Sequence, residues 1–313
     1  MREAGAEVVL PTRFGPLDAA EMLKILPGVD AVLASLDQYP AAVVASPEAG
    51  QLKIISRWGV GYDAIDLEAA TQNGIVITYT PGLLDEAVAD YTVALLLSLA
   101  RRIPESHAAM AAGGWKRNWG HDIFGQTLGI FGLGRIGLAV ARRAAGFNMR
   151  VLACSRSPKP EAVKLGVRFV PLDELLAESD FVTLHASLNP GNRGAIGEPQ
   201  LRRMKPAAFL VNTARGQLVD EAALARALRE GWIAGAALDV FGEEPLPAAH
   251  PLRSAPNLVL SPHQASFAQE TGERVSQAAA EAIIDLMSGR RPRQVLNPDV
   301  FQSPALRARV EER

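Results

Sequence analysis

The stretch Thr127-Leu-Gly-Ile-Phe-Gly-Leu-Gly-Arg-Ile-Gly137 decides the fold of the chain. It opens with a short apolar run, residues 127–131, which predicts a buried strand. It continues as Gly132-x-Gly134-x-x-Gly137 and leads into a helical pattern over residues 138–146. A strand, a glycine turn and a helix in this order predict a dinucleotide-binding unit. The alternative is a glycine-rich turn that binds no ligand.

Each glycine of the motif has a physical task in that interpretation. Gly132 permits the tight turn, Gly134 lets the backbone approach a pyrophosphate, and Gly137 lets the helix pack close to the strand. The phosphates would lie on the free N–H groups at the helix start, where the helix dipole favours negative charge.

Length and composition set outer bounds on the architecture. A chain of 313 residues with 48% hydrophobic residues predicts two domains with sizeable cores. The formal net charge of -2 gives no indication of a nucleic-acid partner or of binding to an acidic membrane surface.

The single cysteine, Cys154, excludes a disulfide framework and fits a reducing compartment. Apolar runs such as residues 93–97 are far shorter than the roughly 18 residues that a membrane span needs. No basic segment followed by an apolar one opens the chain. We therefore expect a cytoplasmic protein, and we expect no metal site.

The first third of the chain alternates between strands and helices, which predicts an α/β fold with a parallel sheet. Strands are expected at 7–10, 31–34, 53–56 and 75–78, and helices at 17–26 and 65–72. Residues 85–102 form a long, nearly all-apolar helix, typical of a position between domains or at a subunit interface. Residues 105–125 are polar, and we interpret them as a linker arm.

From Thr127 the alternation restarts. Strands are expected at 127–131, 150–154, 167–170, 181–185, 208–212, 235–239 and 258–260. Acidic first turns mark helix starts near Leu172 and Asp220, and a last long helix is expected over 271–288.

The segment after the second strand of the dinucleotide unit indicates which cofactor binds. In such units an acidic residue about 20 positions past the first glycine binds the ribose 2′-hydroxyl. Here Ser155, Arg156 and Ser157 occupy that place, and the next acidic residue is Glu161. An arginine and two hydroxyls would attract a 2′-phosphate, which favours NADP over NAD. The alternative is a solvated arginine, with NAD held through backbone contacts.

Three strand ends deliver side chains that can do acid–base chemistry. Arg215 follows the strand at 208–212, Glu243 and Glu244 follow that at 235–239, and His263 follows that at 258–260. Open α/β sheets bind ligands at this edge. Of the other four histidines, His107 and His121 are expected at a surface or interface, and His185 and His250 in structural roles.

These motifs together resemble the D-isomer-specific 2-hydroxyacid dehydrogenases of the phosphoglycerate and glyoxylate/hydroxypyruvate type, over nearly the whole chain. The resemblance rests on segments that follow in the family's order: 57–66, 80–82, 86–90, the glycine motif, 212–216, 238–245 and 261–263. It implies a Rossmann nucleotide-binding domain beside a smaller, flavodoxin-like α/β substrate domain. It also implies hydride transfer between NAD(P) and a D-2-hydroxy acid or 2-oxo acid.

The resemblance assigns roles residue by residue. Arg215, Glu244 and His263 would be catalytic, with Pro245 favouring Glu244 over Glu243 as the partner of the histidine. The backbone amides of Val60 and Gly61 would bind the substrate carboxylate. The cofactor-binding residues would be Gly132, Gly134, Arg135, Ile136, Gly137, Ser155, Arg156, Thr213, Ala214, Arg215, Asp239 and His263.

This sequence departs from the family at three places: the missing acid near residue 155, Ser187 where a proline is usual, and Gln264 where an apolar residue is commoner. The expected domains are 1–97 with 283–313 for the substrate and 98–282 for the dinucleotide. Family members dimerise through the nucleotide-binding domain, so a homodimer is expected.

Two other functions remain open on the same scaffold. One is a nucleotide-sensing corepressor, although the chain has no extended tail for partner motifs. The other is a dehydrogenase of one-carbon or phosphite substrates; one-carbon members carry glutamine where Glu244 stands.

Family members open with a strand and a helix ahead of the segment that matches residues 1–10. The resemblance therefore implies that about 15–20 residues, roughly one βα unit, are missing at the start. Either the natural chain is longer, which we favour, or the substrate domain is rearranged, with residues 295–301 or a partner subunit covering the gap.

Overall fold

The computed structural model describes residues 1–13 and 15–311. The chain divides into two compact units: Met1–Leu84 together with the chain from Ala268 onward, and Asp85–Phe267. Helix α4 (Asp85–Ala100) belongs whole to the second unit because it packs on α6, β8 and β9. Helix α11 (Gln269–Met287) belongs whole to the first because it packs on β1 and β2. The boundaries between the two units thus lie at helix ends. The boundaries expected from the sequence, at 97/98 and 282/283, fall inside α4 and α11.

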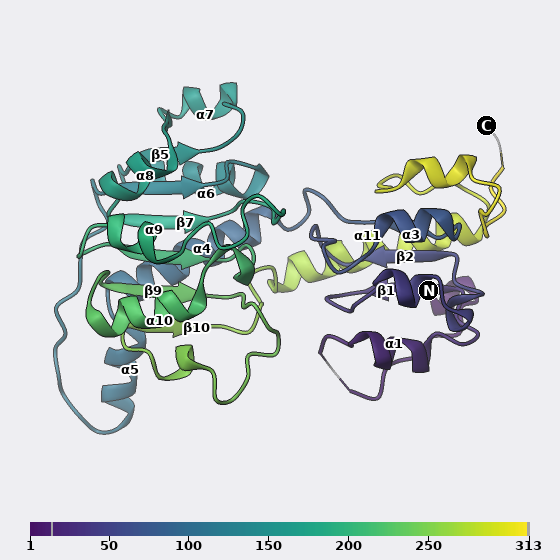
Figure 1. The fold of residues 1–313 in the computed structure, drawn as a ribbon, viewed down its shortest axis with the longest axis horizontal. Coiled ribbons are helices and arrows are strands. Elements are labelled where there is room, and N and C mark those ends of the chain that lie inside the picture. Colours follow the sequence, from purple (N-terminus) through teal and green to yellow (C-terminus); the bar gives the residue numbers. More distant parts are fainter. Residues whose placement is uncertain (14, 312–313) are drawn as a thin grey trace. The chain divides into compact units, whose positions relative to one another are not determined.

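The second unit is built on a seven-stranded parallel sheet (Figure 1). Its strands are β4 (Thr127–Phe131), β5 (Arg150–Cys154), β6 (Arg168–Phe169), β7 (Phe181–Leu184), β8 (Phe209–Asn212), β9 (Gly235–Leu238) and β10 (Leu258–Leu260). The spatial order is β10-β9-β8-β7-β4-β5-β6. This is the doubly wound order of dinucleotide-binding folds, and its switch point lies between β4 and β7.

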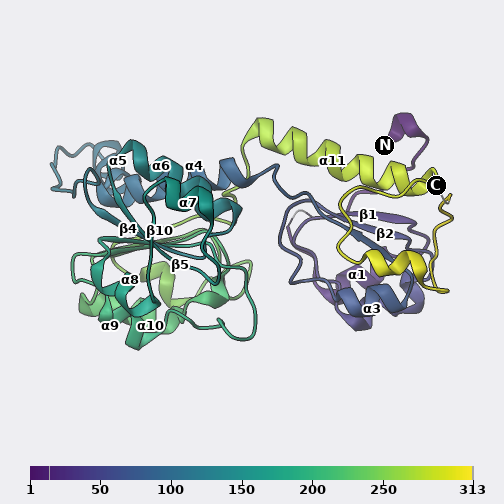
Figure 2. The same ribbon diagram turned by 90° about the horizontal axis from the view of Figure 1, so that it is seen from above.

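Helices cover both faces of this sheet, with α4 and α6 on one side and α8, α9 and α10 on the other (Figure 2). Their bounds, with those of the two remaining helices, are α5 (Ile103–Ala111), α6 (Arg135–Gly146), α7 (Pro160–Lys164), α8 (Leu172–Glu178), α9 (Glu198–Arg203) and α10 (Glu221–Glu230). The four central strands, β4, β7, β8 and β9, are buried on both faces, which explains their continuous apolar runs.

The first unit has a three-stranded parallel sheet in the order β1-β2-β3. Its elements are β1 (Ala31–Ala34), β2 (Ile54–Arg57), β3 (Val76–Thr78), α1 (Ala19–Ile25), α2 (Ala41–Val44) and α3 (Leu67–Gln72). Apolar side chains of α1, α2 and α3 pack on one face, and those of α11 on the other. The outer edge of β3 is covered by the segment around Val295, because Leu296 N–H donates to Ile77 O at 2.8 Å.

Short 3₁₀ helices occupy Arg2–Ala4, Pro47–Ala49, Gly216–Leu218, Pro251–Ser254 and Pro298–Gln302. Most predicted elements are confirmed to within two or three residues. The expected and observed starts coincide for α4 at Asp85, and they lie within two residues of each other for α1 and α10, which Asp18 and Asp220 cap.

Two predictions about elements are wrong. Residues 7–10 form no strand; Val9 and Leu10 are 72% and 71% exposed, and no strand of the described chain pairs with them. The polar segment expected as a linker contains helix α5. No residue of α5 is buried, so it carries no core-facing apolar stripe that a sequence pattern could show.

Candidate active site

The glycine turn has the geometry that its three glycines predict. Gly132 has φ 94°, and a Cβ there would lie 2.3 Å from Ala186 N. A Cβ on Gly137 would lie 2.4 Å from Gly132 O, so the helix packs directly on the turn. Gly134 has no atom within 4 Å of its Cβ position and is exposed. The start of the 12-residue helix α6 is thus open to a phosphate group.

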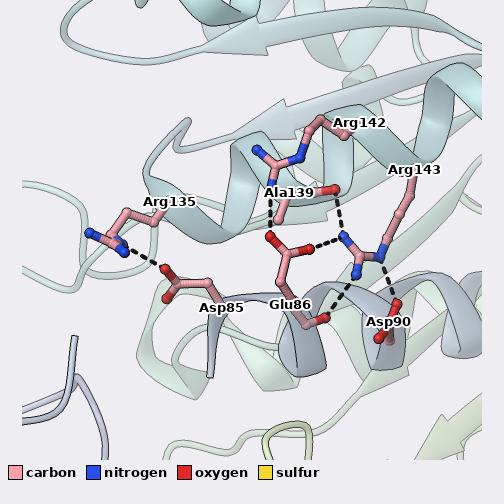
Figure 3. A network of polar contacts seen from close by, with 7 residues as sticks. All are labelled: Asp85, Glu86, Asp90, Arg135, Ala139, Arg142 and Arg143. Atoms are coloured by element: carbon pink, nitrogen blue, oxygen red, sulfur yellow. Dashed lines mark hydrogen bonds and ion pairs between the residues drawn. The ribbon is translucent and has the colours of Figure 1, made fainter. Parts of the chain in front are cut away.

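Arg135 and Ile136 follow in the first turn of α6. Arg135 Nε donates to Asp85 Oδ2 at 2.6 Å, which ties the motif to the start of α4 (Figure 3). Farther along the two helices, Arg142 and Arg143 pair with Glu86, and Arg143 also binds Asp90 at 2.7 Å (Figure 3). These contacts hold α6, and with it the glycine turn, against α4.

Ser155 and Arg156 follow β5 directly, as the sequence predicts. Ser155 is half-buried and Arg156 is exposed. The carbonyl of Cys154, just before them, accepts a hydrogen bond from Gly132 N–H at 2.9 Å. This segment therefore lies beside the glycine turn, where the ribose of a bound dinucleotide would be recognised.

His263 and Glu244 are in direct contact. Glu244 Oε2 lies 2.7 Å from His263 Nδ1, and Glu244 Oε1 accepts a hydrogen bond from Phe241 N–H at 2.8 Å. With Nδ1 held by the carboxylate, Nε2 is the ring nitrogen left to face a ligand. Glu243 is exposed, so the geometry selects Glu244 from the two acids that the sequence leaves as alternatives.

Asp239 fixes the backbone of the histidine loop. It is fully buried, and its carboxylate accepts hydrogen bonds from Ser261 Oγ at 2.6 Å, Gln264 N at 3.0 Å and Ala265 N at 2.8 Å. Burial raises the pKa of this carboxyl, against the effect of these three donors. His263 itself has φ 52°, a left-handed conformation that the surrounding bonds maintain.

Arg215 follows the neighbouring strand, β8. Buried Asn212 shapes the turn before it, because its Nδ2 donates to Arg215 O at 2.9 Å and its Oδ1 accepts from Ala214 N at 3.0 Å. Thr213 Oγ1 lies 2.9 Å from Thr92 Oγ1 on α4. Because β8, β9 and β10 are neighbours, Arg215, Glu244 and His263 all extend from one edge of the sheet.

Val60 and Gly61 lie in the other unit, in a loop after β2. Arg57 Nε donates to Gly61 O at 2.8 Å, and Gly59 N–H donates to Thr80 Oγ1 at 2.9 Å. Gly59 has φ 134°. The loop is therefore held internally, and a role for its two amides stays a prediction.

Comparisons with known proteins bear on what this arrangement does. Residues 93–265 match the profile of the D-isomer specific 2-hydroxyacid dehydrogenase NAD-binding domain. A glyoxylate reductase of Korarchaeum cryptofilum is 48% identical over 277 residues, which cover 86% of this chain and 83% of the relative.

The chain belongs to the D-isomer specific 2-hydroxyacid dehydrogenase family. A glyoxylate reductase of Thermofilum pendens is 41% identical over 96% of this chain and 91% of its own length. A crystal structure from Thermus thermophilus matches with a TM-score of 0.84 and 43% identity over 94% of both chains.

This dehydrogenase is therefore an NAD(P)-dependent oxidoreductase that interconverts 2-hydroxy and 2-oxo acids. The named relatives favour this activity over the corepressor alternative. The match also shows the two-domain α/β fold of the family, with its Rossmann domain. Within the described residues, no helix of the dehydrogenase has the length and apolar character needed to cross a membrane.

Sequence reasoning missed one set of residues in this dehydrogenase. Glu221, predicted only as an acid in the first turn of a helix, accepts a hydrogen bond from Gly242 N–H at 2.7 Å. His250, expected to be structural, lies 3.3 Å from the same carboxylate. Both contacts join residues that are far apart in the sequence, so no local sequence pattern predicts them.

Proposed function

We propose that the protein reduces glyoxylate to glycolate, or hydroxypyruvate to D-glycerate. The observation that carries the proposal is the Glu244–His263 pair, at 2.7 Å, on the sheet edge that also bears Arg215. Relatives named glyoxylate reductase, at 41% to 48% identity, support this substrate over phosphoglycerate.

Each residue of the proposed site has a role that follows from its chemistry. The planar fork of Arg215 suits both the carboxylate and the carbonyl oxygen of a 2-oxo acid. His263 Nε2 donates a proton to the carbonyl oxygen as charge develops there, and Glu244 stabilises the protonated ring through Nδ1. The backbone amides of Val60 and Gly61 bind the substrate carboxylate. A bound nicotinamide supplies the hydride.

The cofactor that we propose is NADP. The turn at Gly132, Gly134 and Gly137, with Arg135 and Ile136, would hold the pyrophosphate, and Thr213, Ala214 and Asp239 would line the nicotinamide side. Ser155 and exposed Arg156 would receive the 2′-phosphate. No carboxylate stands in the 155–160 segment to repel it.

We also propose that the protein is a cytoplasmic homodimer that assembles through the nucleotide-binding unit. Along the arm, defined as residues 103–124, five large apolar side chains are exposed: Ile103 (52%), Met110 (51%), Trp115 (79%), Trp119 (95%) and Phe124 (69%). Exposed apolar groups at this density are typical of an interface. A single cysteine fits a reducing compartment.

The test of the reaction is steady-state oxidation of NADPH with a panel of 2-oxo acids. Glyoxylate and hydroxypyruvate should be accepted, and His263→Ala and Arg215→Ala should each lower kcat/KM by about 10²–10⁴-fold. If His263→Ala turns over an accepted substrate as fast as the parent, the assigned proton donor is wrong. If no 2-oxo acid of the panel is reduced, the proposed substrate class is wrong.

A further inference from the structure

Two consecutive backbone N–H groups hold the loop that carries Glu244. Phe241 N–H donates to Glu244 Oε1 at 2.8 Å, and Gly242 N–H donates to Glu221 Oε1 at 2.7 Å. Neighbouring amides thus bind two different carboxylates, one within the loop and one on helix α10. The second bond ties the loop to a rigid helix.

Gly242 is also held through its carbonyl. Gln217 Nε2 donates to Gly242 O at 3.1 Å. Beside it, Gly216 lies so close to the loop that a Cβ would be 1.9 Å from Phe241 C and 2.3 Å from Gly242 N. Only glycine fits this approach. The segment that follows Arg215 therefore packs directly on the peptide that positions Glu244.

Glu221 has a side-chain partner of its own. Leu252 N–H donates to His250 Nδ1 at 3.4 Å, so the ring proton belongs on Nε2, which lies 3.3 Å from Glu221 Oε2. Both oxygens of Glu221 are thus engaged, and its side chain is only 14% exposed. The titratable groups that act on it are His250, Glu244 and Asp220. Burial raises the pKa of Glu221, Glu244 and Asp220 raise it further, and the Gly242 N–H and His250 lower it.

We infer that Glu221 is a positioning residue for the reaction: by holding Gly242, it fixes the loop so that Glu244 meets His263 Nδ1. The inference rests on the proposed function, because it acts through the proton donor assigned there. His250 and Gln217 support it, one by orienting the Glu221 carboxylate and the other by holding the far side of the same peptide. Nothing in this role requires Glu221 to touch the substrate.

Loss of the contact between Glu221 and Gly242 should change proton delivery by His263 rather than substrate binding. If the loop loosens, Glu244 stabilises the protonated ring of His263 less well, and the rate should decline at a lower pH. Catalytic groups must be held within fractions of an ångström, so a small displacement lowers the rate strongly. Substrate affinity should change less than the rate, because the backbone of Arg215 is also held by Asn212, whose Nδ2 donates to Arg215 O at 2.9 Å.

The experiment compares Glu221→Ala with Glu221→Gln, in NADPH-dependent glyoxylate reduction from pH 5 to 10. Glu221→Ala removes the acceptor for Gly242 N–H; we expect kcat to fall about tenfold, with KM within about twofold of the parent. The pH at which kcat declines on the basic side should move down. Glu221→Gln keeps an acceptor oxygen and should stay within about threefold of the parent. The matched control is Glu230→Ala, on the same helix, where the exposed carboxylate accepts a hydrogen bond from Trp232 Nε1 at 2.9 Å.

A parent-like kcat and pH profile in Glu221→Ala would overturn the inference. So would a fall in kcat with an unmoved profile, which indicates a structural loss alone, or equal defects in the Gln and Ala variants. If Glu221→Ala does not fold, Gln217→Ala is judged by the same criteria. Failure of the proposed function looks different, because the parent enzyme would then reduce no 2-oxo acid or would not need His263.

Discussion

At the scale of residues, the site depends on contacts between particular side-chain and backbone atoms. The sequence predicts which residues lie at the same sheet edge, but not all of these contacts. Strand ends place Arg215, Glu244 and His263 on one edge, and that follows from the order of β8, β9 and β10. The choice between Glu243 and Glu244 depends on the course of one loop, in which Phe241 N–H binds Glu244 Oε1. Both oxygens of Glu244 are thus engaged, one by Phe241 N–H and the other by His263 Nδ1.

Glu244→Gln should move the basic limb of the pH–rate profile for 2-oxo acid reduction to lower pH. Glutamine can still accept a hydrogen bond from Nδ1, but it has no charge to stabilise the protonated ring. Charged hydrogen bonds contribute about 1.5–3 kcal/mol, so the limb should move by about one to two pH units. The measurement is kcat from pH 5 to 10. Glu243→Gln is the control, since that side chain is exposed, and its profile should match the parent's. Matching profiles for all three proteins would contradict the assigned role of Glu244.

Arg156 governs the second prediction at this scale. Arg156→Ala should weaken NADPH binding by about ten- to a hundredfold and leave NADH binding nearly unchanged, because a charged hydrogen bond to the 2′-phosphate is worth about 1.5–3 kcal/mol. The dissociation constants of both cofactors can be measured by nicotinamide fluorescence. Lys164→Ala, on the neighbouring short helix α7, is the control. Equal losses for the two cofactors, or none, would show that Arg156 does not bind the 2′-phosphate.

At the scale of elements, periodicity and capping predict what is buried and miss what is exposed. The core strands of the seven-stranded sheet are predicted nearly to the residue because both of their faces are buried. Helix α5 has no buried residue, so its sequence carries no core-facing apolar stripe to indicate a helix. Residues 7–10 have the composition of a strand, but a strand also requires a partner, and sequence composition carries no information about pairing.

Local sequence patterns do not predict the contacts between elements. Glu221 and Gly242 are 21 residues apart, and Asp239 and Gln264 are 25 apart. Each bond forms because two loops leave adjacent strands at the same edge. The sequence indicates the strands but not the path of the loops, so the residues that position Glu244 and His263 emerge only from the structure.

Strand β7 leads to the third prediction, which concerns acid stability. His185, just after this strand, has a buried Nε2 with no hydrogen-bond partner in the described chain, and burial lowers its pKa from 6.5 to about 3. The unfolded chain binds a proton below pH 6.5 and the folded chain does not until about pH 3. The unfolded state therefore binds more protons in this window, and stability falls as the pH falls.

Between pH 6.5 and about pH 3, the free energy of unfolding should fall by about 1.4 kcal/mol per pH unit. At pH 5 the loss is therefore about 2 kcal/mol. His185→Leu should remove this dependence, so the difference in unfolding free energy between pH 7 and pH 5 should shrink by about that amount in urea titrations. His107→Asn is the control because His107 is exposed, and it should keep the parent's slope. An unchanged slope in His185→Leu would show that His185 titrates normally in the folded protein.

At the scale of the whole molecule, each unit has its own core on both faces of its sheet. The nucleotide-binding unit also presents apolar side chains that none of the described residues cover, along the arm at residues 103–124. Trp119, at 95% exposed, and Trp115, at 79%, are the largest of them. In the proposed dimer a second copy of the chain would bury them, and two-fold symmetry would repeat each contact.

Trp119→Ser should therefore shift the protein from dimer to monomer at micromolar concentration. A buried tryptophan removes about 150–250 Å² from water, worth at most about 4–6 kcal/mol, and the substitution acts twice in a symmetric dimer. Sedimentation velocity across a concentration series measures the change. Val163→Ser is the control: Val163 is 58% exposed on helix α7, outside the arm, and its loss should leave the dimer intact. A parent protein that sediments as a monomer at all concentrations would overturn the proposed assembly. A Trp119→Ser variant that remains as dimeric as the parent would place the interface elsewhere on the molecule.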